Sequence, residues 1–310
     1  MKQNQTKPSV AVLMCTYQGE RFLEEQLDSI FRQQGVVIQL WISDDGSTDA
    51  TLNILQEYKK NSDIELTVIS GPQQGFAKNF LSLTCRSEIK ADYYAYSDQD
   101  DIWEPDKLSR AITLIKNEPE SKPVLYCSRT KLINEAGQEL GLSPLFKKPP
   151  CFANALVQNI GGGNTMVMNN PAHGLLLKVG VLEVVSHDWW TYMLISGAGG
   201  IVIYDSVPYV QYRQHDDNFL GSNMSWGSRL SRIKMLLKDR YTEWNSLNTA
   251  ALKDSWKLLS RSNQLTLEIF STARERPVPG RLYGIWKSGI HRQTMFGNIA
   301  LLVATLLNKL

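Results

Sequence analysis

The stretch VAVLMCTYQGERFLEEQLDSIFRQQ, residues 10–34, decides the fold. Residues 10–15 form an apolar run rich in β-formers, which predicts a strand, and residues 20–34 carry apolar side chains at helical spacing, which predicts a helix. The same pattern recurs up to residue 116, with strands expected at 37–43, 64–70 and 93–97 and helices at 50–60, 76–83 and 105–116. This alternation predicts an α/β protein with a mainly parallel sheet flanked by helices, and with ligands at the carboxyl ends of the strands.

The alternation weakens after residue 128. A glycine turn at residues 161–163 precedes an expected strand at 165–168, a helix near 187–196 and strands at 201–204 and 207–213. Helical spacing then extends over residues 226–270, which include Trp226, Trp244 and Trp256. We therefore expect a main domain over residues 1–222 and a helical C-terminal region over residues 223–310.

Composition narrows the class of protein. A hydrophobic content of 43% and a charged content of 21% are typical of a folded globular chain. The four cysteines are widely spaced, without a C-x-x-C pair, so they predict reduced thiols rather than a zinc site. Because the N-terminus shows neither a signal peptide nor a transmembrane pattern, we expect a cytoplasmic protein.

Charge is divided unevenly along the chain. From residue 225 onward 14 Lys and Arg oppose 5 Asp and Glu, although the net charge of the whole chain is only +2. A basic surface suits nucleic acid or an anionic membrane, or is simply solvated. No zinc knuckle, recognition helix or RNA-binding aromatic motif accompanies it, so nucleic acid is not the expected partner.

Two acidic segments follow expected strands. In SDDGSTD, residues 43–49, a carboxylate can accept hydrogen bonds from a base or a ribose, or Asp49 and Ser47 only cap the next helix. In SDQDD, residues 97–101, three carboxylates in four residues repel one another unless a cation neutralises them. Mg²⁺ or Mn²⁺ fits this second segment, and the alternative is an acidic surface turn that caps the following helix.

Three segments, taken in order and spacing, resemble family 2 glycosyltransferases of the GT-A (Rossmann-like) fold, and within them the bacterial rhamnosyltransferase-like branch. They are TYQGE at residues 16–20, DDGSTD at 44–49 and DQDDIW at 98–103, and the likeness covers about residues 8–220. The resemblance implies a nucleotide-sugar half at about 8–128 and an acceptor half at about 129–222 of the catalytic domain.

The same resemblance implies the roles of individual residues. Asp100, the last Asp of the D-x-D motif, would bind the metal that bridges the donor diphosphate, and His215 either completes this site or is structural. The tyrosine-arginine-glutamine-histidine segment that ends at His215 also brings Arg213 toward a phosphate. The implied nucleotide-sugar site consists of Thr16, Tyr17, Glu20, Asp44, Asp45, Asp98, Gln99 and Arg213.

Asp188 lies about ninety residues after the D-x-D motif, where the family has its catalytic aspartate. By the resemblance it is the base that deprotonates the acceptor hydroxyl in a single, inverting displacement, and otherwise it is a helix N-cap. The Q-x-x-R-W signature of processive synthases is absent, so one addition per acceptor is expected. Acceptor contacts are expected at Trp103, Gly163, Asn164, Trp189 and Trp190, although residues 161–165 can equally be an ordinary tight turn.

The implied activity is inverting, metal-dependent transfer of L-rhamnose from dTDP-L-rhamnose to a glycan or lipid-linked acceptor. The implied destination is bacterial surface polysaccharide, O-antigen or lipopolysaccharide core. The alternatives are a UDP-hexose-dependent transferase of the same fold and a non-enzymatic nucleic-acid or sugar-binding protein.

The C-terminal region ends in an apolar stretch at residues 295–307, which is too short to span a bilayer. With the aromatic Tyr283 and Trp286 nearby, it predicts a peripheral segment on the cytoplasmic face of the inner membrane. The basic residues expected to meet the anionic lipid are Arg274, Arg276, Arg281, Lys287 and Arg292. The alternatives are a helix packed on the main domain and an oligomer contact.

Overall fold

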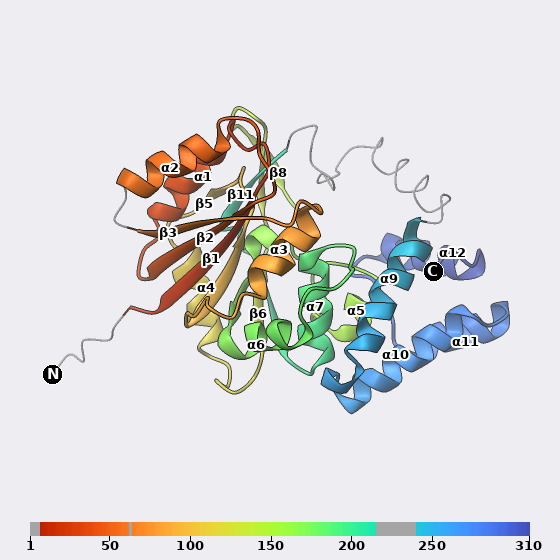
Figure 1. Cartoon of the computed structure of the whole chain (residues 1–310). Helices are drawn as coiled ribbons and strands as arrows, with labels where there is room; N and C mark the ends of the chain where they lie inside the picture. Colours follow the sequence, from red (N-terminus) through yellow and green to blue (C-terminus); the bar gives the residue numbers. More distant parts are fainter. Residues whose placement is uncertain (1–6, 62–63, 215–239) are drawn as a thin grey trace.

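The computed structural model describes residues 7–61, 64–214 and 240–310. Figure 1 shows a central sheet with helices on both faces and a group of C-terminal helices at one side, which confirms the predicted α/β class. The strands are β1 (Ser9–Thr16), β2 (Val37–Asp44), β3 (Glu65–Ser70), β4 (Tyr93–Ser97), β5 (Ile102–Trp103), β6 (Val124–Ser128), β7 (Lys131–Ile133), β8 (Glu139–Leu142), β9 (Val167–Asn169), β10 (Ile201–Asp205) and β11 (Val210–Arg213). The helices are α1 (Leu23–Phe31), α2 (Thr51–Asn61), α3 (Phe76–Thr84), α4 (Lys107–Ile115), α5 (Phe152–Ala155), α6 (Asn170–Val179), α7 (His187–Gly197), α9 (Arg240–Asp254), α10 (Arg261–Arg274), α11 (Val278–Lys287) and α12 (Met295–Leu306), with short 3-10 turns η1 (Gly163–Thr165) and η2 (Trp256–Leu258).

The main sheet has seven strands in the order β10-β6-β9-β4-β1-β2-β3. β1 is parallel to β2 and β4, β2 to β3, and β10 to β6, whereas β9 is antiparallel to both of its neighbours. Because β1, β2 and β4 run in the same direction, the loops that follow them leave the sheet at one edge. The register sets Thr16 opposite Asp44, so the first two of these loops start side by side.

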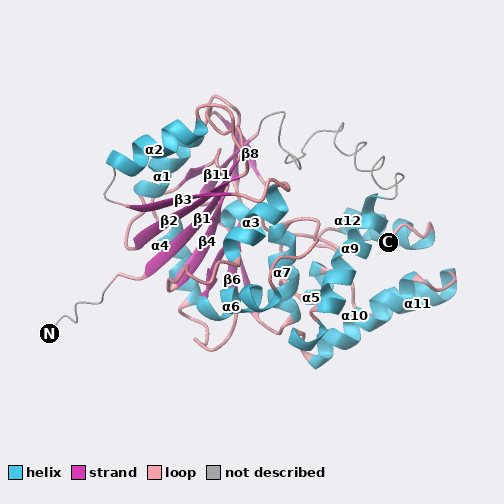
Figure 2. Ribbon diagram, viewed as in Figure 1, coloured by secondary structure: helices cyan, strands magenta, loops and turns pink. Residues whose placement is uncertain are grey.

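Each face of this sheet has its own core, and Figure 2 shows the helices that cover it. Val10, Val12 and Met14 of β1 point into the core under α1, α2 and α4. Ala11 and Leu13 point into the other core, under α3, α6 and α7. Both faces of β1 are therefore buried, which explains its unbroken apolar sequence.

A second sheet, in the order β5-β11-β7-β8, begins directly after the acidic segment at residues 97–101. β5 pairs antiparallel with β11, and β11 pairs parallel with β7. This pairing returns the end of β11, with Arg213, to the acidic segment more than a hundred residues earlier in the chain.

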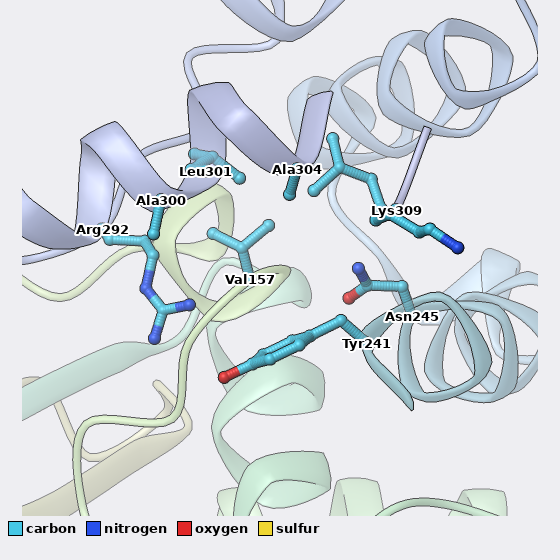
Figure 3. A pocket seen from close by; sticks show the side chains of 9 residues that line it. Val157, Tyr241, Asn245, Arg292, Ala300, Leu301, Ala304 and Lys309 are labelled. Atoms are coloured by element: carbon cyan, nitrogen blue, oxygen red, sulfur yellow. The ribbon is translucent and has the colours of Figure 1, made fainter. Parts of the chain in front are cut away.

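The C-terminal helices share the core of the main domain. Leu252 of α9 and Phe270 of α10 belong to the same buried cluster as Trp190 of α7. The seam between α9, α12 and Val157 leaves a cavity of only about 20 Å³, whose lining side chains are drawn in Figure 3. Leu301 of α12 is also buried, so one face of this helix does pack on the rest of the protein.

The opposite face of α12 is exposed and apolar, and consists of Met295, Phe296, Ile299, Leu302, Val303 and Leu306. Trp286 of α11 is 77% exposed. Two of the expected membrane-facing arginines are used elsewhere, because Arg281 is buried and donates to Thr305 O, and Arg274 donates to Leu310 O. No helix in the described ranges is long and apolar enough to cross a membrane.

Some expected boundaries need correction. The helix expected at 20–34 begins at Leu23, because the preceding residues form a loop that is hydrogen-bonded to residues 47–49. The helix expected at 105–116 begins at Lys107. The stretch 226–270 is divided by η2, and His215, Trp226 and the expected domain boundary at 222 lie outside the described residues.

Candidate active site

The loops after β1 and β2 are bonded to each other at the edge of the sheet. Thr16 Oγ1 donates to Asp44 Oδ1 over 2.8 Å, and Asp44 also accepts from the N–H groups of Gly46 and Ser47 and from Ser47 Oγ. Gly46 has a φ of 97°, a backbone conformation that favours glycine. Asp44 is only 6% exposed, so the carboxylate that was expected to hold a base is used to shape this turn.

Neighbouring carboxylates in these loops also bind backbone amides. Asp45 accepts from the N–H groups of Gln73 and Gly75, in the loop that follows β3. Glu20 N donates to Asp49 Oδ2, and Asp49 Oδ1 accepts from the first amide of α2. Asp49 thus accepts from the start of α2 although Ala50 lies between it and the helix, and the three loops after β1, β2 and β3 form one bonded rim.

Gln99 ties this rim to the acidic segment after β4. Its side-chain amide accepts from Tyr17 N at 2.9 Å and donates to Tyr17 O at 3.0 Å. A Cβ at Gly19 would lie 2.5 Å from Gln99 Oε1, so only glycine leaves room for this contact. The Tyr17 side chain itself is 59% exposed at the rim.

Four carboxylates of the candidate site influence one another electrostatically, those of Asp98, Asp100, Asp101 and Asp188. Burial, together with the negative charges of Asp100 and Asp188, raises the pKa of Asp98 to about 8. Burial and the charges of Asp100 and Asp98 raise the pKa of Asp101 well above its usual range. The influence of both Asp100 and Asp188 on Asp98 brings the predicted metal-binding and base residues to one site.

Lys107 was missed by the sequence reasoning, because a lysine in a helical pattern is normally at the surface. Its side chain is 1% exposed, and Nζ lies 3.2 Å from the centroid of the Trp103 ring without a hydrogen-bond partner in the described residues. Burial lowers its pKa well below the usual range, and the charges of Asp101 and Asp98 oppose that shift.

Arg213 holds the acidic segment from the other side. Its Nε donates to Asp100 O at 2.9 Å, its backbone N–H donates to Asp101 Oδ1, and its Nη2 forms an ion pair with Glu25 Oε2 at 2.6 Å. The side chain is 1% exposed. Arg213 therefore positions the acidic loop, and the expectation that it binds a donor phosphate is not supported by its buried, multiply bonded guanidinium.

Asn164 also holds the acidic segment in place. It is 3% exposed and donates from Nδ2 to Asp101 Oδ2 over 2.5 Å. The expectation that it contacts the acceptor is not supported, because this amide is buried beneath the acidic segment.

Asp188 lies in the first turn of α7, whose N-cap is Ser186. Its Oδ2 accepts from Asn159 Nδ2 at 2.9 Å and from Gly163 N at 3.2 Å. Its Oδ1 accepts from Ser186 Oγ at 2.5 Å and from Trp189 N at 2.7 Å. The alternative that Asp188 is the N-cap is therefore wrong, and its side chain is held in one position by four donors.

The glycine turn before η1 is shaped by close packing. A Cβ at Gly161 would lie 2.6 Å from Cys127 Cβ, and one at Gly163 would clash with His187 Nε2. His187 is buried between α3 and α7 and stacks on Phe80 with ring centroids 3.8 Å apart. Gly163 is itself buried, so it supports Asp188 through its N–H group rather than as an exposed acceptor loop.

The three expected acceptor-binding indoles are core residues. Trp103, Trp189 and Trp190 are 2%, 7% and 0% exposed, and Trp189 Nε1 donates to Ala155 O. Large apolar side chains next to a site are often its packing rather than its lining. We therefore do not keep these indoles as acceptor contacts.

The residues of the acidic segment fit a Mg²⁺ or Mn²⁺ ion that is bound mainly through substrate. Such an ion is usually held by one or two carboxylates together with phosphate oxygens and water. The described residues contain no group of three or more His, Cys, Asp and Glu side chains arranged around a metal position. Asp100 and Asp98 are the residues that would supply carboxylates to such a shared site, and His215 lies outside the described residues.

The parallel strands of the main sheet end in loops that gather beside clustered carboxylates, an arrangement expected of the GT-A fold. The family model described as "Glycosyl transferase family 2" matches residues 11–160. Together with the relative below, this match shows that the chain belongs to glycosyltransferase family 2.

Among its relatives, dTDP-rhamnosyl transferase RfbG of Shigella flexneri is 30% identical over 252 residues, which cover 78% of this chain and 85% of that protein. An uncharacterized glycosyltransferase of Haemophilus influenzae is 26% identical over 221 residues, 67% of this chain and 66% of that protein. The first similarity agrees with the rhamnosyltransferase-like branch expected from the motifs.

Solved structures confirm the fold. S. aureus TarS in complex with UDP-GlcNAc has a TM-score of 0.56 at 13% identity, over 97% of this chain and 90% of that chain. Mannosyltransferase PcManGT from Pyrobaculum calidifontis, in complex with GDP-Man and Mn²⁺, has a TM-score of 0.51 at 17% identity, over 98% of this chain and 86% of that chain. At these identities the likeness carries the fold alone.

Proposed function

We propose that this protein is an inverting, metal-dependent glycosyltransferase that moves L-rhamnose from dTDP-L-rhamnose to a glycan or lipid-linked acceptor in bacterial surface polysaccharide synthesis. The proposal is carried by the buried Asp98, which follows β4 directly and whose pKa is raised by burial and by the charges of Asp100 and Asp188. The choice of donor is supported by the 30% identity to a dTDP-rhamnosyl transferase. A UDP-hexose is the alternative donor within the same mechanism.

In this proposal the rim binds the nucleotide. The exposed ring of Tyr17 offers a face for stacking on the base, and the reciprocal bond of Gln99 to its backbone holds that ring in place. Asp44 and Asp45 hold the loops around this ring in place, because their carboxylates accept hydrogen bonds from backbone N–H groups. Thr16 and Glu20 belong to the same rim and limit its width.

Asp100, with Asp98, would hold the divalent ion beside the diphosphate. When bound, Mg²⁺ or Mn²⁺ supplies positive charge that stabilises the leaving nucleoside diphosphate. Arg213 holds the Asp100 backbone in place by donating to its carbonyl oxygen. The protein groups would thereby orient the donor, and none of them would form a covalent bond to it.

Asp188 would act as the base. An ionised carboxylate accepts about four hydrogen bonds, and all four positions of Asp188 are filled by protein donors. The acceptor hydroxyl must therefore replace one of these donors, and Ser186 can yield most easily because its hydroxyl proton rotates freely. As Asp188 takes the hydroxyl proton, the acceptor oxygen would bond to the anomeric carbon on the face opposite the nucleoside diphosphate, whose bond to that carbon breaks, so the anomeric configuration would invert.

The exposed apolar face of α12 is proposed to rest on the anionic cytoplasmic face of the inner membrane, where a lipid-linked acceptor would be found. Trp286 and Lys287 of α11 and the exposed Arg276 lie in the same region of the chain and suit an interfacial contact. Self-association through this face is the competing use of the same surface.

Calorimetric titration with dTDP, UDP and GDP, each with and without Mn²⁺, tests the proposal. Tight binding of dTDP that depends on Mn²⁺ supports the donor, and a preference for UDP moves the assignment to a hexose. Absence of nucleotide binding would remove the enzyme assignment. Asp100→Ala should abolish the Mn²⁺ dependence, whereas Asp188→Asn should bind the donor normally and lose transfer.

A further inference from the structure

Phe76 is a large apolar side chain that is open to solvent at the edge of the candidate site. It is the first residue of α3 and is 43% exposed. The loop that leads into it belongs to the rim, because Asp45 accepts from the N–H groups of Gln73 and Gly75. α3 also packs against α7, the helix whose first turn contains Asp188 (Figure 1). The start of α3 is therefore attached to the proposed nucleotide site and lies on the helix that positions the proposed base.

The Phe76 ring is the exposed end of a group of packed rings. It meets the His187 ring edge-on, with ring centroids 6.2 Å apart. His187 in turn stacks on Phe80, one helical turn further along α3, and meets Tyr96 of β4 edge-on. These three rings are buried, so they hold the outermost ring in place while part of its surface stays open. Because His187 directly precedes Asp188, this open surface lies close to the proposed base.

A second contact joins the start of α3 to the segment that leads into α7. Lys78 forms an ion pair with Glu183, which lies three residues before Ser186. In the mechanism proposed above, the acceptor hydroxyl replaces Ser186 Oγ at Asp188 Oδ1. The acceptor would therefore reach the base beside this segment, on the side that is in contact with the start of α3.

The chemistry of a sugar acceptor suits this ring. A pyranose ring has faces made of C–H groups, and an aromatic side chain offers a large rigid apolar surface to such a face. Ligand sites usually combine surface of this kind with a few polar groups that fix orientation, and Asp188 would be such a group. Phe76 can offer that surface because it is exposed, whereas the three indoles first expected at the acceptor are buried.

We propose that Phe76 is an acceptor contact, whose ring packs on the C–H face of the sugar that presents its hydroxyl to Asp188. This inference rests on the proposed function, since it takes Asp188 as the base. It narrows the acceptor to a pyranoside, because an open-chain polyol or an amino-acid hydroxyl has no flat C–H face to place on the ring.

Saturation-transfer NMR titrations test the contact with three probes: methyl α-L-rhamnoside, methyl β-D-glucoside and methyl N-acetyl-β-D-glucosaminide, each with and without dTDP and Mn²⁺. These glycosides have no alkyl chain that could bind the apolar face of α12. Phe76→Leu removes the ring and should weaken glycoside binding about three- to tenfold, whereas Phe76→Tyr should bind as the wild type does. Leu265→Ala, at an exposed position of α10, is the control and should also bind normally. No glycoside binding by the wild type, or equal affinity in Phe76→Leu, overturns the proposal.

Nucleotide binding and transfer rates separate this contact from the proposed function. Phe76→Leu should bind dTDP with Mn²⁺ as the wild type does, and a loss of dTDP affinity in place of glycoside affinity would overturn the acceptor role. In transfer from dTDP-L-rhamnose to the tightest-bound glycoside, Phe76→Leu should raise the KM for the glycoside and leave kcat unchanged, whereas a lower kcat alone would indicate a displaced base and refute the contact. Glycoside binding that depends on Phe76, in a protein that binds no dTDP, would refute the transferase and leave the sugar contact standing.

Discussion

Replacing Gly163 by alanine tests whether the glycine turn sets the position of Asp188. The added Cβ would clash with His187 Nε2 and would lie 3.5 Å from Asp188 Cβ. His187 cannot move aside easily, since its ring is stacked on Phe80 in the core. Overpacking of this kind costs about 1–3 kcal/mol, and the entropic gain of Gly→Ala offsets about 0.4–1 kcal/mol. We expect the free energy of unfolding to fall by about 1–2 kcal/mol.

The effect on transfer should be larger than the effect on stability. Gly163 N donates to Asp188 Oδ2, so a shift of the turn also shifts the proposed base. A displacement of about 1 Å can lower a rate about a hundredfold. Binding of dTDP should be unchanged, because Tyr17 and Gln99 make no hydrogen bond to this turn.

Gly174→Ala in α6 is the matched control. A Cβ at Gly174 meets nothing within 4 Å, so this variant should gain about 0.5–1 kcal/mol and keep full transfer. Urea unfolding and single-turnover transfer are measured for both variants. Wild-type stability and rate in Gly163→Ala would refute the reasoning, as would equal losses in the two variants.

Three further predictions concern the acidic loop and α12. Arg213→Met should lower the free energy of unfolding by about 1–3 kcal/mol in urea, since it leaves the Asp100 and Glu135 carbonyl groups without their donor, whereas Glu25 is 56% exposed and returns to water. A variant of normal stability and weakened donor binding would restore the phosphate role. Asp98 has a pKa of about 8 in the folded protein against an ordinary value of 3.8, so folding takes up a proton at any pH between these two values. The contribution of this carboxyl group to stability is therefore fully present below pH ~4 and is lost as the pH rises through 8. Asp98→Asn should therefore flatten the fall of Tm between pH 5 and 9 in EDTA, and an unchanged slope contradicts the shift. Phe296→Ser combined with Ile299→Ser should release the protein from anionic vesicles at unchanged Tm, because both side chains are exposed; continued binding would assign α12 another use.

The main strands could be predicted because both of their faces are buried and their sequences are therefore continuously apolar. The main helices could be predicted because their apolar residues recur at helical spacing. The strands expected at 37–43 and 93–97 agree with β2 and β4 to within one residue. β9, in contrast, is inserted antiparallel between β4 and β6, and no local pattern encodes which distant strand it will join. α6 was missed although its sequence carries recognisable start and stop signals: Asn169 caps the helix by accepting from Ala172 N, Pro171 lies in its first turn, and Gly180 ends it.

The candidate site was predicted in outline for a topological reason. The carboxyl ends of parallel strands lie at one edge of a sheet, so the acidic segments after β2 and β4, on either side of β1, were expected at the same edge. The roles of Arg213 and Asn164 could not be predicted, because burial depends on partners far away in sequence. Arg213 pairs with Glu25, which precedes it by 188 residues. Trp103 was misassigned for the same reason, because its strand is held by distant partners: its N–H donates to Ser29 Oγ and it pairs with Val210 of β11.

The shared core of α7 and the C-terminal helices makes the chain one cooperative unit. Trp189, next to the proposed base, meets Trp244 of α9 edge-on with ring centroids 6.3 Å apart. Calorimetry should accordingly record a single unfolding transition, for which the calorimetric enthalpy equals the van't Hoff enthalpy. A fragment cut near residue 222 would expose this apolar surface and aggregate, so the catalytic half of the molecule is not a separable module.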